Sequence, residues 1–278
     1  MLLALTSSGG MPPANDTFLE IYLNGRAALS VGNSLAEGEP QDEAGLYGMD
    51  LPKSEVTSIE YFIAANSMFD MPEEYGDIRA DSGFTRLYLF SGTEEKNISW
   101  GPFSKVPQSI QELEKRLNQV RRSIRKHPLQ AIKVTLGLVE EVMVGEEFHL
   151  NFSIRNQGSE PVALQIFPEN STRPSVFKLY AAKQNETLAT SQVFFDLYQQ
   201  AQYSSSVRFA GPLIDKTTIE LAPGEVIKMR ALAPFKFGSS GNYQLYGFAE
   251  PALELISSGK PKRLECFLAT RPIAVNVR

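Results

Sequence analysis

The change of hydrophobic rhythm at His127-Pro128 constrains the fold of this chain more than any other feature of its sequence. Before it, apolar residues recur at alternating spacings of three and four: Ile110, Leu113, Leu117, Val120 and Ile124. This spacing predicts an amphipathic helix over residues 107–126, with Pro107 in its first turn and Pro128 preventing its continuation. After it, short segments alternate with a period of two. We therefore expect two domains, residues 1–127 and 128–278.

Residues 1–127 predict an α+β domain, in which two helices cover one face of an antiparallel sheet. Strands are expected over residues 1–6, 17–23, 27–31, 83–90 and 96–100, and a further helix over 54–67. Asn24-Gly25 is typical of a tight hairpin turn, and Ser54 is typical of a helix N-cap. Residues 32–53 are rich in Gly, Glu and Asp, so we interpret them as an irregular acidic loop.

Residues 128–278 predict an all-β immunoglobulin-like sandwich. Residues 147–155 alternate strictly between apolar and polar side chains, which places His149 on the solvent face of a strand. Other strands are expected over residues 131–138, 162–167, 176–181, 217–221, 226–231, 242–249, 263–269 and 273–277. The aromatic segment 188–213 is interpreted either as packing over one end of the sandwich or as a contact surface.

The charge of the chain is distributed unevenly. The net charge is −5 overall, but residues 1–105 hold 6 Lys+Arg against 16 Asp+Glu, a net −10. Residues 106–127 hold 6 against 2, a net +4, and the last helical turns carry Arg121, Arg122, Arg125 and Lys126. We interpret this basic end as a solvated face with salt bridges. The acidic total and the absence of interleaved aromatic residues argue against a nucleic-acid partner.

No catalytic constellation is present in the sequence. The only histidines, His127 and His149, fall in different domains, and the single cysteine, Cys266, lies in an apolar stretch. No spacing predicts a metal site, a nucleophile elbow or a phosphate loop, and carboxylate pairs such as Glu140-Glu141 are interpreted as solvated surface. We therefore expect no catalytic residue, no metal and no cofactor. An enzyme on the first domain would need a polar pocket between its helices and its sheet.

The sequence predicts no membrane span, because no run approaches about 18 apolar residues. Residues 1–5 are apolar, but they are too few for a signal peptide and lack a basic start. As it stands the sequence indicates a cytoplasmic protein. The alternative is an exported protein whose leader has been removed from the sequence.

The first domain combines a strand that runs into Ser8-Gly9-Gly10, a helix that ends on Met68-Phe69-Asp70-Met71-Pro72, a hairpin after Asp81 and a last helix that begins with a proline. In these residues and in the order of its elements it resembles the emfourin family, small protein inhibitors of thermolysin-like metalloproteases. It departs from that family in residues 32–53 and in Met11-Pro12-Pro13. The same residues also fit a plain bulge at the two glycines, with Phe69 and Met71 filling the core.

The second domain resembles the intracellular subtilisin-inhibitor family of β-sandwiches. The similarity rests on residues 147–156, on Leu221-Ala222-Pro223-Gly224-Glu225 and on residues 241–247. The same motifs occur in many unrelated bacterial immunoglobulin-like modules, where they mark the sandwich and not an activity.

Both resemblances imply a protein that binds other proteins and does not catalyse a reaction. We expect a protease inhibitor or a protease-associated protein, whose partner is a protease. Its contact residues would be Ser7, Ser8, Gly9, Gly10 and Met11, in the loop 7–13. The alternative is a structural or adhesive protein of the cell surface or periplasm, with the sandwich as a spacer.

Overall fold

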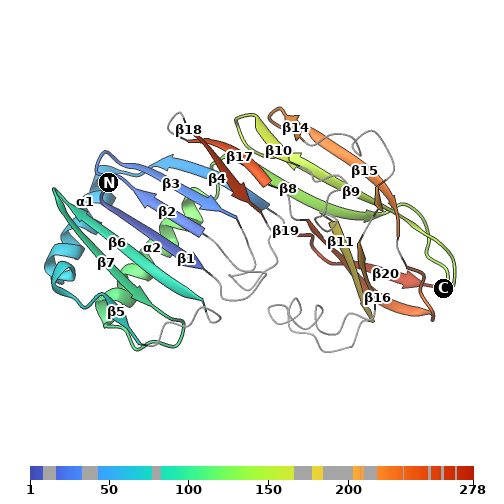
Figure 1. The fold of residues 1–278 in the computed structure, drawn as a ribbon, viewed down its shortest axis with the longest axis horizontal. Coiled ribbons are helices and arrows are strands. Elements are labelled where there is room, and N and C mark those ends of the chain that lie inside the picture. Colours follow the sequence, from blue (N-terminus) through green and yellow to red (C-terminus); the bar gives the residue numbers. More distant parts are fainter. Residues whose placement is uncertain are drawn as a thin grey trace. The chain divides into compact units, whose positions relative to one another are not determined.

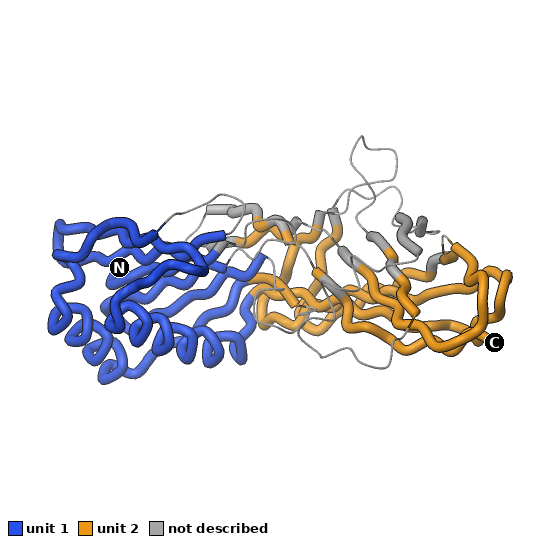
Figure 2. The backbone as a smooth tube through the Cα atoms, turned by 90° about the horizontal axis from the view of Figure 1, so that it is seen from below, with its two compact units in different colours: residues 1–33, 46–129 blue, residues 34–45, 130–278 orange. Residues whose placement is uncertain are grey.

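The computed structural model describes residues 1–8, 17–32, 43–76, 83–165, 177–183, 203–206, 208–209, 218–233, 235–249, 252–257, 260–266 and 268–278. Over these residues the fold is mostly β, with two α-helices (Figure 1). The chain divides into two compact units, residues 1–33 with 46–129 and residues 34–45 with 130–278 (Figure 2). None of the helices described is long and apolar enough to cross a membrane.

Unit 1 is built on a sheet with the strand order β4-β3-β2-β1-β6-β7-β5. Its strands are β1 (Leu3–Ser8), β2 (Thr17–Ile21), β3 (Arg26–Val31), β4 (Glu43–Asp50), β5 (Glu74–Tyr75), β6 (Phe84–Ser91) and β7 (Glu94–Trp100). The residues of β4 from Leu46 onward belong to this unit. β1 is central and pairs antiparallel with β2 on one side and β6 on the other.

Two helices, α1 (Lys53–Ala65) and α2 (Gln108–Ile124), lie on one face of this sheet (Figure 1). The predicted apolar stripe of α2 is buried along its whole length, as are Val56, Ile59 and Ile63 of α1. Opposite them Leu3 and Leu5 of β1 are at most 1% exposed. Apolar side chains therefore fill the interface between the helices and the sheet.

The predicted hairpin at Asn24-Gly25 is confirmed. Gly25 adopts φ +93°, a region that favours glycine, and its N–H donates to the Tyr22 carbonyl at 3.0 Å. The Gly25 carbonyl accepts from the Leu51 N–H at 2.8 Å, and a Cβ on Gly25 would lie 2.9 Å from the Leu51 carbonyl oxygen. The turn thus sits directly against the residues that lead into α1.

Residues 32–53 are not an irregular loop throughout, because β4 occupies Glu43–Asp50. Within this strand Ala44, Leu46 and Tyr47 are buried. Gly45 adopts φ +142°, and a Cβ there would overlap the Gln130 carbonyl oxygen. The glycine that indicated a loop instead permits a close approach of two strands.

Two local predictions in unit 1 are wrong. Ser54 does not cap α1: the helix begins after Pro52, which offers no side-chain hydrogen bond. Phe69 and Met71 are only half-buried, whereas Met68 is 0% exposed. A short 3-10 helix over Met68–Asp70 turns Met68 inward, so Met68 fills the core in their place.

Unit 2 contains three sheets. The first has the order β13-β15-β9-β8, and the second has the order β12-β11-β16 with β19 and β20 both paired to β16. Their strands are β8 (Pro128–Leu138), β9 (His149–Asn156), β11 (Phe177–Lys183), β12 (Tyr203–Ser206), β13 (Arg208–Phe209), β15 (Val226–Leu232), β16 (Gly241–Ala249), β19 (Leu268–Ala269) and β20 (Ile273–Val277). We assign the immunoglobulin letters A, B, C, C′, D, E, F and G in chain order to β8, β9, β11, β12, β13, β15, β16 and β20. The two sheets then have the strand orders D-E-B-A and C′-C-F-G, which are those of an immunoglobulin sandwich.

The third sheet of unit 2 has the order β14-β10-β17-β18. Its strands are β10 (Val162–Gln165), β14 (Thr218–Leu221), β17 (Ala252–Ser257) and β18 (Lys260–Glu265). They come from three separate stretches that interrupt the sandwich order. The sequence did not predict β17, which is a short strand. The aromatic segment 188–213 lies outside the described residues except at 203–206 and 208–209.

An aromatic cluster closes one end of the sandwich. Phe237 stacks on Phe148 with ring centroids 5.4 Å apart, and its ring centroid lies 4.5 Å from that of Tyr243. Because Phe148 precedes β9 and Tyr243 lies in β16, the cluster joins the first sheet to the second. The Tyr243 hydroxyl also donates to the Ser239 carbonyl at 3.0 Å, the tyrosine corner of immunoglobulin-like domains.

Candidate functional site

The predicted contact residues lie only partly within the described structure. Ser7 and Ser8 are the last residues of β1 and not part of a turn, whereas Gly9, Gly10 and Met11 lie outside the described residues. Ser7 pairs with Thr17 of β2 and Thr85 of β6. Strand pairing on both sides therefore carries β1 two residues further than the sequence predicted.

A buried arginine holds this end of β1. The Arg121 guanidinium Nη2 donates to Ser7 Oγ at 3.2 Å and to the Leu5 carbonyl at 3.5 Å. Arg121 is 7% exposed, so its interpretation as part of a solvated basic face is wrong. It lies four residues after Leu117 and three before Ile124, and this spacing places it on the buried face of α2.

The carboxyl of Glu114 lies in the same neighbourhood. Burial raises the pKa of Glu114, and the positive charge of Arg121 opposes that rise. The two groups belong to α2 and are two turns apart. The arginine that holds the end of β1 therefore also acts on a partly buried carboxyl of its own helix.

A second surface lies at one end of unit 2, where the loop between β8 and β9 is unusually apolar for an exposed turn. Val139 is 38% exposed, Met143 and Val144 are each 40% exposed, and Leu232 at the end of β15 is 41% exposed. Leu232 pairs with His149, and the Val139 N–H donates to the His149 carbonyl at 3.2 Å. Val139, His149 and Leu232 therefore form one row on the outer face of the sheet. We call Val139, Met143, Val144 and Leu232 the apolar end.

The loop that carries most of the apolar end is held by main-chain hydrogen bonds. The Val144 N–H donates to the Arg278 carbonyl at 2.9 Å, and the Arg278 N–H donates to the Val142 carbonyl at 3.1 Å. The Gly145 N–H donates to the Phe237 carbonyl at 2.9 Å. These bonds tie the loop to β20 and to the aromatic cluster, so its exposed side chains stand on a fixed backbone.

The carboxylate of Glu140 adds a further anchor. Its Oε1 accepts from the His149 N–H at 2.8 Å and lies 2.7 Å from His149 Nδ1. The hydrogen bond with the His149 side chain, followed by the one from its main chain, lowers the pKa of Glu140. His149 is on the solvent face, as predicted, with its side chain 38% exposed.

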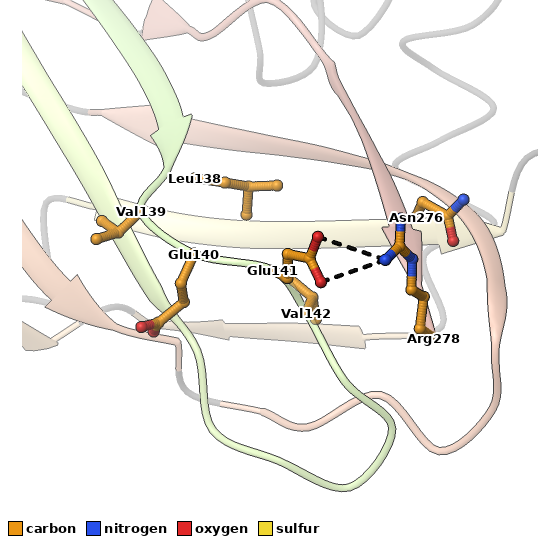
Figure 3. A pocket seen from close by; sticks show the side chains of 7 residues that line it. All are labelled: Leu138, Val139, Glu140, Glu141, Val142, Asn276 and Arg278. Atoms are coloured by element: carbon orange, nitrogen blue, oxygen red, sulfur yellow. Dashed lines mark hydrogen bonds and ion pairs between the residues drawn. The ribbon is translucent and has the colours of Figure 1, made fainter.

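An open pocket of about 420 Å³ lies between this loop and β20 (Figure 3). It is lined by Leu138, Val139, Glu140, Glu141, Val142, Asn276 and Arg278. Glu141 and Arg278 point toward each other, with an Oε2–Nη1 distance of 3.3 Å, while Glu140 points away from them. The pocket therefore joins apolar walls to exposed charges.

The arrangement of these groups suits binding. Across the described parts of the chain, no group of three or more His, Cys, Asp or Glu side chains is placed to hold a metal ion. The apolar end was missed from sequence, although Val142-Met143-Val144 stands between two pairs of glutamates and between two expected strands. Its exposure depends on contacts with β20 and Phe237, which are distant in sequence.

Comparison with known proteins does not assign the chain to a family. No family model matches the chain, and no curated protein matches it. Among solved structures, a PapD-like domain of human CEP192 is 13% identical with a TM-score of 0.26, over 52% of this chain and 84% of that one. The fimbrial major subunit AggA of Escherichia coli is 10% identical with a TM-score of 0.29, over 55% of this chain and 99% of that one. Likenesses at this level carry no argument about the present chain.

Proposed function

We propose that this chain is a non-enzymatic protein-binding protein and that the apolar end of unit 2 is its contact surface. The observation that carries this proposal is the exposure of Val139, Met143, Val144 and Leu232, each 38–41%, on a tied backbone. Exposed apolar side chains gathered in one place mark interaction sites more often than scattered ones do.

The main-chain hydrogen bonds of the β8–β9 loop support this proposal, because they reduce the entropy that the loop loses on binding. A flexible loop loses conformational entropy when a partner fixes it, and that loss weakens the complex. The Val144 and Gly145 N–H groups are already hydrogen-bonded, at 2.9 Å each. The loop therefore needs little further ordering when it meets a partner.

The test uses a displayed library of random 12-residue peptides, selected on the immobilised full chain. We expect the enriched peptides to lose about tenfold or more in affinity for Leu232→Asp and for Val144→Asp, because a carboxylate would be placed in the apolar contact. Val226→Asp is the matched control, since Val226 is 39% exposed on the same face of the same strand, at its opposite end. Peptides that bind all three variants equally, or a selection that enriches none, would overturn the proposal.

Protease inhibition through the loop 7–13 is the second candidate, and one observation favours it. Arg121 hydrogen-bonds Ser7 and the Leu5 carbonyl, which fixes the strand that enters this loop. Inhibitors act by presenting a rigid segment to the protease cleft, and a fixed strand end supports such a segment.

Assays of the intact chain at micromolar concentration against one thermolysin-like and one subtilisin-like protease test this second candidate. We expect inhibition that Arg121→Met weakens and that Arg122→Met, at an exposed neighbour, leaves unchanged. Absence of inhibition of both proteases, with the chain uncleaved, rules out this candidate.

A further inference from the structure

Carboxylates outnumber cations around the apolar end, where the cations Arg230, Lys236 and Arg278 come from neighbouring segments. Residues 139–147 contain Glu140, Glu141, Glu146 and Glu147 and no lysine or arginine. Three of the four carboxylates have a basic partner: His149 for Glu140, Arg278 for Glu141 and Lys236 for Glu147. Within the described residues, Glu146 has no ion pair.

Two of these ion pairs are exposed enough to be exchanged for others. The side chains of Glu141 and Arg278 are 74% and 66% exposed, and those of Glu147 and Lys236 are 59% and 53% exposed. Exposed pairs of this kind contribute little to stability, so a cation from outside can replace the present partner at small cost. Glu141 and Glu146 are then the carboxylates most available to an incoming cation.

We propose that the apolar end binds a polypeptide segment that presents one apolar side chain with lysine or arginine on both sides of it. This inference rests on the proposed function. The apolar side chain contacts Val139 at the pocket beside the loop that carries Met143 and Val144, and the flanking cations meet Glu141 and Glu146. An acidic segment would face like charges and be disfavoured, and so would a nucleic-acid backbone.

The open pocket adds a place for the central side chain. Its walls include Leu138, Val139 and Val142, and its rim includes Glu141. A side chain that enters from solvent therefore leaves water while its neighbours stay within reach of the carboxylates. This combination of an apolar centre and a charged rim is typical of protein–protein contact surfaces.

Three nine-residue peptides with a central leucine test the partner's chemistry, flanked by lysines, by serines or by glutamates. Affinity for the full chain is measured by fluorescence anisotropy at two salt concentrations. We expect the lysine peptide to bind about tenfold more tightly than the serine peptide at low salt, and the difference to shrink as salt screens the charges. Glu141→Gln and Glu146→Gln should each reduce that difference, whereas Glu220→Gln, at an exposed site on β14, should leave it unchanged.

The outcomes separate this inference from the proposed function. Equal binding of the lysine and serine peptides, with both lost in Val144→Asp, would refute the cationic partner and leave the binding surface standing. Tightest binding of the glutamate peptide would refute it as well. Binding of any of these peptides that Val144→Asp does not weaken would instead overturn the proposed surface itself.

Discussion

Two segments of this chain are held in fixed positions, and they are held in different ways. Beyond its strand pairing with β2 and β6, the end of β1 is held by one side chain, the Arg121 guanidinium, which donates to Ser7 Oγ and to the Leu5 carbonyl. The β8–β9 loop depends on main-chain bonds to Arg278 and Phe237. A single substitution can remove the first anchor, whereas the second persists through most changes of side chain because the backbone supplies it.

The cores beneath these segments differ as well. Leucine and isoleucine dominate the interface of α1 and α2 with their sheet, whereas Phe148, Phe237 and Tyr243 lie under the β8–β9 loop. Aromatic rings bury more surface per residue, so fewer side chains carry the closure of the sandwich. Damage to one of them should therefore be more costly than damage to the arginine anchor.

The largest effect is expected for Phe237→Ala. Phe237 is 0% exposed and contacts the rings of Phe148, Phe235 and Tyr243, so its truncation should lower the free energy of unfolding by about 3–5 kcal/mol. Urea unfolding followed by circular dichroism measures this change. Phe103→Ala is the control, because Phe103 is 93% exposed and should cost almost nothing. Equal effects of the two substitutions would show that Phe237 does not carry the closure of the sandwich.

Arg121→Met should have the next largest effect. Methionine retains the apolar stem but removes the bonds to Ser7 and Leu5, at a cost of about 1–3 kcal/mol. Amide hydrogen exchange should accelerate at Ser7 and Ser8 and stay unchanged in residues 139–147. Arg122→Met, at an exposed position, serves as the control. Unchanged exchange at Ser7 would show that strand pairing alone fixes this end of β1.

Tyr243→Phe isolates the tyrosine corner from the aromatic packing. The ring stays in place, but the hydroxyl that donates to the Ser239 carbonyl at 3.0 Å is lost. We expect a loss of about 1 kcal/mol by thermal or urea unfolding. A loss as large as that of Phe237→Ala would mean that the hydrogen bond, and not the rings, closes this end of the sandwich.

Glu114→Gln should have the smallest effect, and the opposite sign. Burial raises the pKa of Glu114 in the folded chain, so stability should fall as pH rises from the ordinary carboxyl pKa through the raised one. Glutamine cannot ionise and should remove that fall, which raises stability at neutral pH by about 0.5 kcal/mol or less. Glu112→Gln, at an exposed site on the same helix, is the matched control for the loss of a carboxylate from α2. A destabilised Glu114→Gln would show that the attraction to Arg121 outweighs the cost of burial.

Local patterns in the sequence predicted the elements that local forces determine. The stripe of α2, the Asn24-Gly25 turn and most strands of unit 2 follow from spacing and turn residues. The burial of Arg121 was missed because residue type outweighed position, although its spacing from Leu117 places it among the apolar residues. An arginine can be buried where the fold provides a hydrogen-bond acceptor for its guanidinium. Here that acceptor is Ser7, which is 114 residues away in the sequence.

The other missed features also depend on distant partners. β4 was missed because Gly45 lies against Gln130, a contact between residues far apart in the sequence that no local pattern contains. The apolar end was missed because the bonds that order it come from Arg278 and Phe237. Of the five predicted contact residues, Ser7 and Ser8 fall within the described structure, in a strand, and the role assigned to them stays a prediction.

The link between the β8–β9 loop and β20 has a consequence for the timing of folding. Val142 bridges Val277, and Val144 bonds Arg278, so the loop is ordered by residues more than 130 positions later in the chain. Contacts of such long sequence separation form late, and a ribosome delivers residues 273–278 last among those seen here. The proposed binding surface therefore cannot form before residues 273–278 have been made. A partner that recognises it would distinguish chains that include these residues from chains that lack them.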